Sequence, residues 1–570
     1  MLTRISSLQK KLVAMPSYEP PAENFKMPIK SNPFYLVWMV VILLHAGTQI
    51  KAQTVYENHR NEVYNYLSRL AQKGLVVFDD HIRPLSRVYI GACLDSVQRN
   101  QSALSVIEKK ELQFYLQEYR DQQDTTASKA DESIRFLKKD EYGRFRTASA
   151  IGKNAAFYFD PIITGAQFGG RNTSYDQRST GMRIWGRAGK QFSFQFAYQD
   201  VLLKGKGYDS TGSMGPETGY IRKDSTQYRT LNYSQFRGSI AYHFKNGSLA
   251  IGQDQLVWGY GENGRIVLSD KAPAFPFLRL DYQPFPWLKF HYTHAWLNSR
   301  VVDSVNSYPS GNGGIYGGDR IQFIPKYFAT HSIQIKLKKG LDISLGESII
   351  YSDRMNIGYL IPVMFFKLYD NIANNSDIRA GSNGQLFFMA SSRNQIKNTH
   401  LYATLFIDEI RQSTIFNKNK SRNQLGYTLG ASVTDLFLPY LTAGVEYTRV
   451  NPFVYRNLFE AQNYSHQGFS LGDWMGNNSD RLIFSVRHTP IPKLRLYLRH
   501  QMIRKGGSGT LAEQYFAEPQ PPFLFAQQPT QKEWHFRAAY EWLNSLTLTG
   551  WYSHWNNTGG SWSMGVSYGL

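Results

Sequence analysis

Residues 233–258 read YSQFRGSIAYHFKNGSLAIGQDQLVW. Every second position carries an apolar or small residue, and the positions between are mostly polar: Phe236, Gly238, Ile240, Tyr242 and Phe244 alternate with Arg237, Ser239, Ala241 and His243. An alternation of period two predicts a strand with one apolar and one polar face. Lys245-Asn246 interrupts the pattern and reads as a tight turn between two antiparallel strands.

The same period runs from about residue 150 to the C-terminus. It recurs at Phe192–Tyr198, Ile333–Leu337, Leu494–Leu498, Trp534–Trp542 and Trp562–Leu570. Together these runs predict an all-β fold of about 18 antiparallel strands over residues 150–570. The number is even, as in bacterial outer-membrane barrels.

The connections between these strands alternate in length. Every second one is a tight turn, at Gly189-Lys190, Lys245-Asn246, Phe285-Pro286, Lys339-Gly340, Phe437-Leu438, Ile491-Pro492 and Asn544. Most of the others are long, at about 203–232, 300–326, 354–384, 453–478 and 506–530. Short periplasmic turns and long outer loops characterise transmembrane β-barrels, whereas a β-sandwich does not predict this rhythm. Closure into a barrel also removes the sheet edges that a bilayer would not tolerate.

An uncharged apolar run, FYLVWMVVILL, occupies residues 34–44 and is too short to span a bilayer as a helix. Lys26 and Lys30 precede the run, and small or polar residues follow it as far as Ala52. These features predict a secretory signal peptide over residues 1–52, with Met27 as an alternative start and a retained signal anchor as the alternative interpretation.

Helical spacing follows in the first part of the expected mature chain. Glu62–Lys73 places Val63, Tyr66, Leu67 and Leu70 on one face, and Gly74 suits the position that ends a helix. Further helices are expected at about 88–97 and 102–119, and residues 121–142 read as a polar linker. Residues 53–142 are therefore expected to form a small periplasmic helical bundle with its linker.

Composition limits the function classes. The net charge is +20, aromatic residues make up 15% of the chain, and Cys93 is the single cysteine, which excludes an intramolecular disulfide. An exported, aromatic-rich, polar chain is either a soluble secreted β-protein or an outer-membrane barrel. The positive charge favours acidic glycans or lipopolysaccharide phosphates as partners, with a merely solvated basic surface as the alternative. Nucleic acid does not fit that compartment.

Catalytic motifs are lacking: there is no H-E-x-x-H, no G-x-S-x-G and no P-loop, and the 13 histidines are scattered. No enzyme activity, cofactor or metal is expected, although a barrel hydrolase with a triad assembled from different strands stays open. Gly259, Gly261 and Gly264 match G-x-G-x-x-G, but Pro273 and Pro276 argue against the helix that a dinucleotide site needs. Asp408-Glu409 is a candidate acidic pair, but neighbours on a strand face opposite sides, so pairing of one of them with a lumenal arginine is the simpler interpretation.

Three stretches then combine: Gly252–Leu280; Asn383–Phe387 with Tyr402–Glu409; and Gly468–Arg481 (GFSLGDWMGNNSDR). With Tyr64–Leu70 and Arg83–Arg87, they resemble the capsule assembly protein Wzi family over nearly the whole mature chain. The residues that carry the resemblance are Gly259, Gly261, Leu268, Ser269, Pro273, Asn383, Gly384, Asp408, Glu409, Gly472, Gly476 and Asp480. The chain departs from the pattern at Gln385, where an acidic residue is expected, and in an extended third outer loop.

The resemblance implies an outer-membrane barrel with a periplasmic helical bundle that binds capsular or exopolysaccharide at the cell surface, as a lectin. Aromatic rings for stacking and cations for acidic groups suit such a ligand, and the candidates in the outer loops are Trp258, Tyr260, Arg265, Lys271, Lys367, Tyr369 and Trp474. For each of these, a place in the interfacial girdle or in loop packing is the alternative. A diffusion porin and a barrel hydrolase stay open as other functions, and the oligomeric state stays undetermined.

Overall fold

The structure is a computed structural model that describes residues 55–119, 133–140, 143–152, 155–189, 191–208, 220–225, 229–311, 318–374, 381–414, 416–417 and 419–569. The expected signal peptide, residues 1–52, lies outside these residues. No helix within the described ranges is long and apolar enough to cross a membrane.

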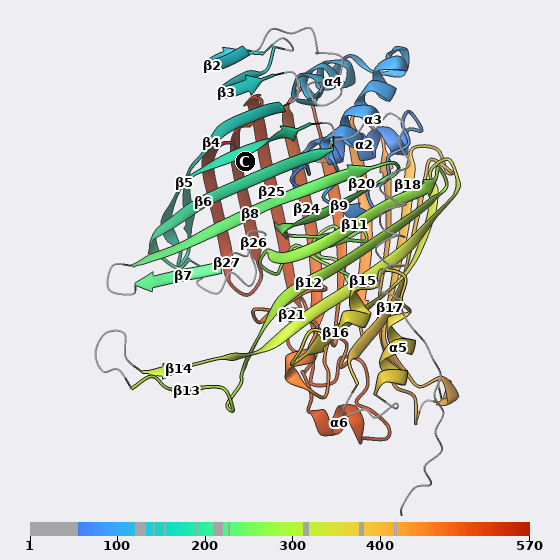
Figure 1. Cartoon of the computed structure of the whole chain (residues 1–570). Helices are drawn as coiled ribbons and strands as arrows, with labels where there is room; N and C mark the ends of the chain where they lie inside the picture. The colour runs from blue at the N-terminus through green and yellow to red at the C-terminus, as the bar shows by residue number, and fades with distance from the viewer. Residues whose placement is uncertain are drawn as a thin grey trace, which may run out of the picture. The chain divides into compact units, whose positions relative to one another are not determined.

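Eighteen strands of the described chain form the wall of a closed antiparallel barrel (Figure 1). The wall is closed by the pairing of its last strand with its first, from Tyr568↔Ile163 to Ser561↔Gly170. In order around the barrel the strands are β4 (Ala155–Gly170), β5 (Ser174–Ala188), β6 (Phe192–Lys206), β8 (Thr230–Phe244), β9 (Gly247–Asp254), β11 (Phe275–Phe285), β12 (Leu288–Val302), β15 (Phe323–Lys338), β16 (Leu341–Ser352), β17 (Asn383–Arg393), β18 (Thr399–Ile410), β19 (Asn423–Thr434), β20 (Leu441–Val450), β23 (Ser479–His488), β24 (Leu494–Lys505), β25 (Gln531–Leu543), β26 (Leu546–Trp555) and β27 (Gly559–Tyr568). The predicted fold class and strand number are confirmed.

The two faces of the wall differ as the alternation predicts. On β8, Phe236 and Ile240 are exposed on the outside, whereas Ser239 and His243 are buried on the inside. The same contrast holds on β27, where Met564 is 69% exposed and Ser563 is buried. An apolar exterior around a polar interior is the arrangement of a barrel that contacts lipid.

Tight turns and long loops lie at opposite ends of the barrel. The β8–β9 turn is the two residues Lys245 and Asn246, and Asn246 has the positive φ of 67° that such a turn requires. Short β-ribbons lie within the long connections: β13 (Tyr308–Pro309) pairs with β14 (Asp319–Arg320), and β21 (Ser465–His466) with β22 (Phe469–Ser470). The loop end also carries α5 (Phe366–Ala373) and α6 (Leu511–Tyr515).

Three N-terminal helices pack at the tight-turn end: α2 (Val63–Gln72), α3 (Arg87–Arg99) and α4 (Val106–Tyr119). Their shared core includes Leu67, Leu70, Leu94 and Leu112, all fully buried. Gly74 has φ of 72° and closes α2, as expected, since its N–H bonds back to the Ala71 carbonyl.

One part of the expected linker is regular structure. Residues 133–139, read as polar linker, form the strand β2 (Ser133–Lys139), which pairs with β3 (Phe145–Ile151). β3 in turn pairs with the start of β4, beyond the point where β27 ends. The prediction of a linker was wrong for this segment. Its charged residues made it look like a linker, but Ile134, Phe136 and Leu137 lie among them and are exposed on the hairpin.

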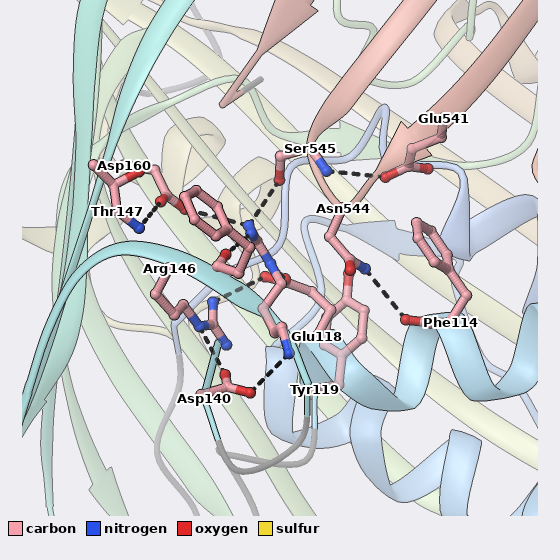
Figure 2. A network of polar contacts seen from close by, with 12 residues as sticks. Phe114, Glu118, Tyr119, Asp140, Arg146, Thr147, Asp160, Glu541, Asn544 and Ser545 are labelled. Atoms are coloured by element: carbon pink, nitrogen blue, oxygen red, sulfur yellow. Dashed lines mark hydrogen bonds and ion pairs between the residues drawn. The ribbon is translucent and has the colours of Figure 1, made fainter. Parts of the chain in front are cut away.

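A buried ionic network ties this hairpin to the helices and the wall (Figure 2). Arg144 bonds to Glu118 at the end of α4, to Asp160 on β4 and to Ser545 of the β25–β26 turn. Arg146 donates to Asp140 at 3.0 Å. Both guanidinium groups are 1% exposed. Burial alone would raise the pKa of Glu118, but the surrounding arginines hold that pKa well below its usual range.

A second ionic cluster attaches α2 to another tight turn of the barrel. Arg69 donates to Glu108 on α4 and to Asp435 in the β19–β20 turn, each at 2.5 Å. Lys73 contacts the same two carboxylates, at 2.7 and 3.1 Å. Glu108 is fully buried, so removal of its partner leaves a buried charge with incomplete compensation.

The change Arg69→Ala is therefore expected to lower the free energy of unfolding by about 3 kcal/mol, because Lys73 alone remains to neutralise Glu108. Denaturant unfolding of the purified barrel in detergent measures the loss. The exposed Arg99 on α3 is the matched control, and Arg99→Ala should stay within about 0.5 kcal/mol of the parent. Equal stability of the two variants would show that the cluster does not attach the helices.

Candidate functional site

The loop between β9 and β11 folds into the barrel instead of projecting from it. Its strand β10 (Val257–Trp258) pairs with β1 (Ile82–Arg83), which belongs to the N-terminal segment. Trp258 also bridges to Leu268 across the loop, and its N–H bonds to the Leu268 carbonyl at 2.9 Å. The expectation that Tyr260, Arg265 and Lys271 stand in an exposed outer loop was wrong, since all three lie inside.

Apolar burial holds the loop inside. Trp258, Ile266, Val267 and Leu268 are at most 1% exposed and share one core with inward residues of the wall, among them Phe387, Met389 and Phe406. Each large side chain buried in this way contributes about 1.5–3 kcal/mol. Apolar residues on the inner face of β17 and β18 thus give the loop a surface to pack on.

An ionic contact joins the N-terminal segment, the loop and the wall beside this core. Asp80 accepts hydrogen bonds from Arg393 of β17 at 2.7 Å and from the Tyr260 hydroxyl at 2.8 Å. It also pairs with Arg83. Burial would raise the pKa of Asp80, but the two guanidinium groups overcome it and hold the pKa below its usual range.

The loop between β20 and β23, residues 451–478, also folds inward. Asp473 is fully buried and pairs with Arg481 at 2.9 Å. The Trp474 ring N–H donates to the Asn263 carbonyl at 2.6 Å, so the two inward loops contact each other. Tyr455 packs on Gly472, where a Cβ would come within 2.4 Å of the ring, so a larger residue would displace Tyr455.

The rest of the lumen is a cavity of about 1440 Å³ that both polar and apolar side chains line. Its lining reaches from Thr173, Gly207 and Trp555 at the loop end to Gln72 and Tyr115 of the helices. Tyr260, Arg265, Lys271 and Trp474 line one side of it. Burial lowers the pKa of Lys271 to about 8, with Asp270 opposing the shift.

A continuous series of aromatic rings also lines this cavity, on β4, β5, β24, β25 and β26. Successive centroids are 4.4 Å apart from Tyr175 to Phe168, 6.0 Å from Phe168 to Trp551, 5.9 Å from Trp551 to His535 and 6.1 Å from His535 to Tyr497. Tyr208, in the loop after β6, extends the series at 6.1 Å from Tyr175. The rings form a track, here called the aromatic series, from the loop end into the lumen.

Paired charges lie along the aromatic series. Tyr497 donates to Glu262 at 2.7 Å, and Arg487 pairs with the same carboxylate. Arg499 pairs with Glu533 at 2.7 Å, and Arg537 with Glu62 at 3.3 Å. Arg487 and Arg537 are 39% and 40% exposed to the cavity, so their guanidinium groups keep donors available for a ligand.

A smaller pocket of about 240 Å³ lies at the rim, at the loop ends of β17 and β18. It unites five of the predicted residues, Lys367, Asn383, Gly384, Asp408 and Glu409. Asp408 accepts hydrogen bonds from the Tyr455 N–H at 2.7 Å and from Gln385 at 3.2 Å, so its partners are amides. Glu409 accepts from Gln424 at 3.4 Å, and Arg422 is the arginine whose charge acts on it most strongly. Gln385 stands where an acid was expected and also accepts from Ser348.

The other predicted residues have packing roles. Trp258, Leu268 and Ser269 lie in the inward loop, and Ser269 N–H bonds to the Leu471 carbonyl. Tyr369 donates to Asn356 at 2.9 Å. Asp480 pairs with Arg504, and Gly476 has φ of 68° in a turn. The described residues contain no group of three or more His, Cys, Asp and Glu side chains arranged to hold a metal ion.

Sequence reasoning missed the aromatic series. Its members occupy inward positions of five strands, and a linear pattern does not reveal which rings meet across a barrel. One signal in the sequence could have revealed it. Phe168, Trp551 and His535 occupy positions of the alternating pattern that belong to the polar faces of their strands.

Comparison with solved structures shows the same fold. The chain is similar to Wzi, an outer membrane protein of Escherichia coli involved in group 1 capsule assembly and described as a carbohydrate-binding β-barrel, with a TM-score of 0.55, 13% identity, and coverage of 91% of this chain and 100% of that chain. It also matches OccK8 (OprE) of Pseudomonas aeruginosa with a TM-score of 0.41, 10% identity, and coverage of 73% of this chain and 97% of that chain. No protein-family model and no curated protein matches the sequence.

The inward loop generates a testable prediction about the lumen. Asp254 pairs with Phe275, so a four-residue Gly-Ser linker can replace residues 255–274 without opening the wall. The shortened protein should conduct ions several-fold better than the parent in planar bilayers, because the packed loop no longer fills the lumen.

The matched control replaces residues 303–322, between Val302 and its partner Phe323, with the same linker. The described residues of that loop do not line the cavity, so conductance should stay at the parent value. If both shortened proteins conduct like the parent, the β9–β11 loop is not what restricts the lumen.

Proposed function

We propose that this chain is an outer-membrane barrel that binds an acidic polysaccharide at the cell surface, with the lumenal cavity and its aromatic series as the binding site. The observation that carries the proposal is the run of five rings from Tyr175 to Tyr497 beside partly exposed arginines. The ligand is retained, not transformed, and the proposed function is attachment or assembly of a surface polysaccharide.

Residence in the outer membrane rests on the wall itself. Its exterior is apolar, its tight turns and long loops lie at opposite ends, and the fold is that of an outer-membrane protein. The long loops then face the medium, and α2–α4 face the periplasm.

The chemistry of the cavity suits sugars. The face of an aromatic ring is electron-rich and attracts the weakly positive C–H groups of a pyranose. Arg487 and Arg537 offer planar donors that match carboxylates and phosphates. A net charge of +20 draws an anionic polymer toward the barrel, and several weak contacts along a repeating chain add through effective concentration.

One observation favours a second function, passage of a solute through the lumen. The cavity lining extends from Thr173 at the loop end to Tyr115 on α4, almost the length of the barrel. A channel would give the unaltered protein a stable conductance that a polysaccharide does not block, whereas a binding site predicts low conductance that the ligand reduces further.

Trp551→Ala should weaken binding of an acidic polysaccharide by about tenfold, because a central ring of this kind is worth about 1–2 kcal/mol. Glycan-array binding or isothermal titration of the purified barrel measures the change. Tyr552→Ala is the matched control: Tyr552 is the next residue on β26, is 48% exposed on the outer face and should not alter binding. Equal affinity of the two variants would remove the aromatic series from the binding site.

The proposed orientation predicts that an epitope tag inserted after Gly311, between β13 and β14, binds antibody on intact cells. A tag between Phe437 and Leu438, in the β19–β20 turn, should bind only after the outer membrane is permeabilised. Both sites are exposed, so the wall should close with either insertion. The opposite labelling would reverse the assignment of the two ends.

A further inference from the structure

Part of the outer wall is covered from the outside. Residues of β15 and β16 pair as Ile333↔Leu345, His331↔Glu347, Ala329↔Ile349 and Tyr327↔Tyr351. Ile333 and Leu345 are 48% and 64% exposed, so this row of side chains points away from the lumen. Further along the same row Glu347 and Ile349 are buried, which requires cover on the exterior.

The cover is the segment of residues 354–373, which contains a 3₁₀ turn (Ile357–Leu360) and α5 and lies beside β16 and β17 (Figure 1). The Tyr359 ring lies 4.6 Å from the Tyr351 ring, and the Phe366 ring lies 4.6 Å from the ring of His331. Tyr292 of β12 donates to the Tyr359 carbonyl at 2.8 Å. The segment therefore packs on the outside of three neighbouring strands.

Glu347 explains why the segment lies there. Its carboxylate accepts from the Phe366 N–H at 2.5 Å, the first residue of α5, and lies 3.3 Å from His331 Nε2. α5 has no N-terminal side-chain cap of its own, so the wall carboxylate supplies the acceptor that the helix lacks. In turn, the segment shields an outward acidic group that would be costly in contact with hydrocarbon.

A second carboxylate fixes the segment's own fold. Asp370 on α5 accepts from the Tyr359 hydroxyl at 2.8 Å and from the Ser382 N–H at 3.0 Å. These bonds join α5 to the 3₁₀ turn and to the start of the chain that leads into β17, and the side of α5 that carries Lys367 and Asp370 lines the rim pocket.

The opposite surface of the segment is apolar and uncovered. Its exposed side chains have exposed fractions between 42% and 79%: Met355, Ile357, Ile361, Val363, Phe365, Leu368 and Ile372. A loop in water does not present so many large apolar residues together. These side chains continue the apolar exterior of the wall, where Leu386 and Phe388 of the adjacent β17 are also exposed.

We propose that residues 354–373 lie within the lipid of the outer leaflet and contact acyl chains through Val363, Phe365, Leu368 and Ile372. The partner is the bilayer, because the patch is continuous with the lipid-facing wall and covers the outward pair Glu347 and His331 within it. The inference requires that the wall spans a membrane and is independent of polysaccharide binding. The segment thus acts as a lipid-contacting flank of the rim pocket.

The test places single cysteines for a fluorescent nitrobenzoxadiazole label in the full chain, reconstituted into phosphatidylcholine nanodiscs. The native Cys93 is buried, and burial raises the pKa of its thiol to about 12, so it should stay unlabelled. Probes at Leu368→Cys and Ile372→Cys should be quenched by brominated acyl chains as strongly as one at the wall position Leu345→Cys. A probe at Asn306→Cys, in the exposed β12–β15 loop, should not be quenched.

The controls separate the outcomes. Quenching at Leu345 without quenching at Leu368 and Ile372 would overturn the inference while leaving the membrane barrel intact. No quenching at Leu345 would overturn the membrane residence on which both proposals depend. Spontaneous disulfide dimers of unlabelled Leu368→Cys protein in nanodiscs that hold two barrels, with no lipid quenching of the labelled probe, would show that a second copy covers the patch, and would also overturn the inference.

Glu347→Gln provides an independent readout, since it removes the charge that caps α5 but keeps the shape of the side chain. It should increase the rate of protease cleavage within residues 354–373 in detergent and reduce the quenching of the Leu368→Cys probe. The neighbouring inward change Ser348→Ala is the matched control and should leave both unchanged. Identical behaviour of the two variants would contradict the docking mechanism.

Discussion

The closed ladder of backbone hydrogen bonds is the constraint on which the rest of this structure depends. β27 pairs with β4, so every wall strand has a partner on each side and no N–H or C=O row is left open. Closure gives each strand an outer and an inner face, and the outer face is apolar whereas the inner face is mostly polar. Everything else, from the inward loops to the helices at the tight-turn end, is packed against a wall that does not need them for its own pairing.

The inner face is itself divided. Where β17 and β18 turn Phe387, Met389 and Phe406 inward, the β9–β11 loop finds an apolar surface and fills the lumen. Where β24–β26 turn Tyr497, His535 and Trp551 inward among charges, the lumen remains an open cavity. The same closed wall therefore supports a packed core on one side and a candidate binding site on the other.

Buried charged groups join the parts of the molecule beside their apolar contacts. Arg69 and Arg144 attach the helices and the β2–β3 hairpin at the tight-turn end, Asp80 with Arg393 attaches the N-terminal segment inside, and Glu347 attaches α5 outside. In surroundings of low polarity, such pairs fix one geometry, since a misplaced partner leaves a charge uncompensated. This accounts for the precise placement of segments that are far apart in the sequence.

The sequence by itself determined the strands, their even number, the two kinds of connection and the end of α2 at Gly74, because alternation, tight turns and helix ends are local properties of the backbone. Only the tertiary structure decided where the long connections go. Residues 255–274 and 354–373 both carry apolar side chains, yet one packs inside the wall and the other outside it. A loop at the rim of a barrel can reach both the inner and the outer surface of the wall. The surface it packs on depends on Phe387 and Phe406 on the inner face and on Glu347 on the outer face, which are distant from the loops in the chain.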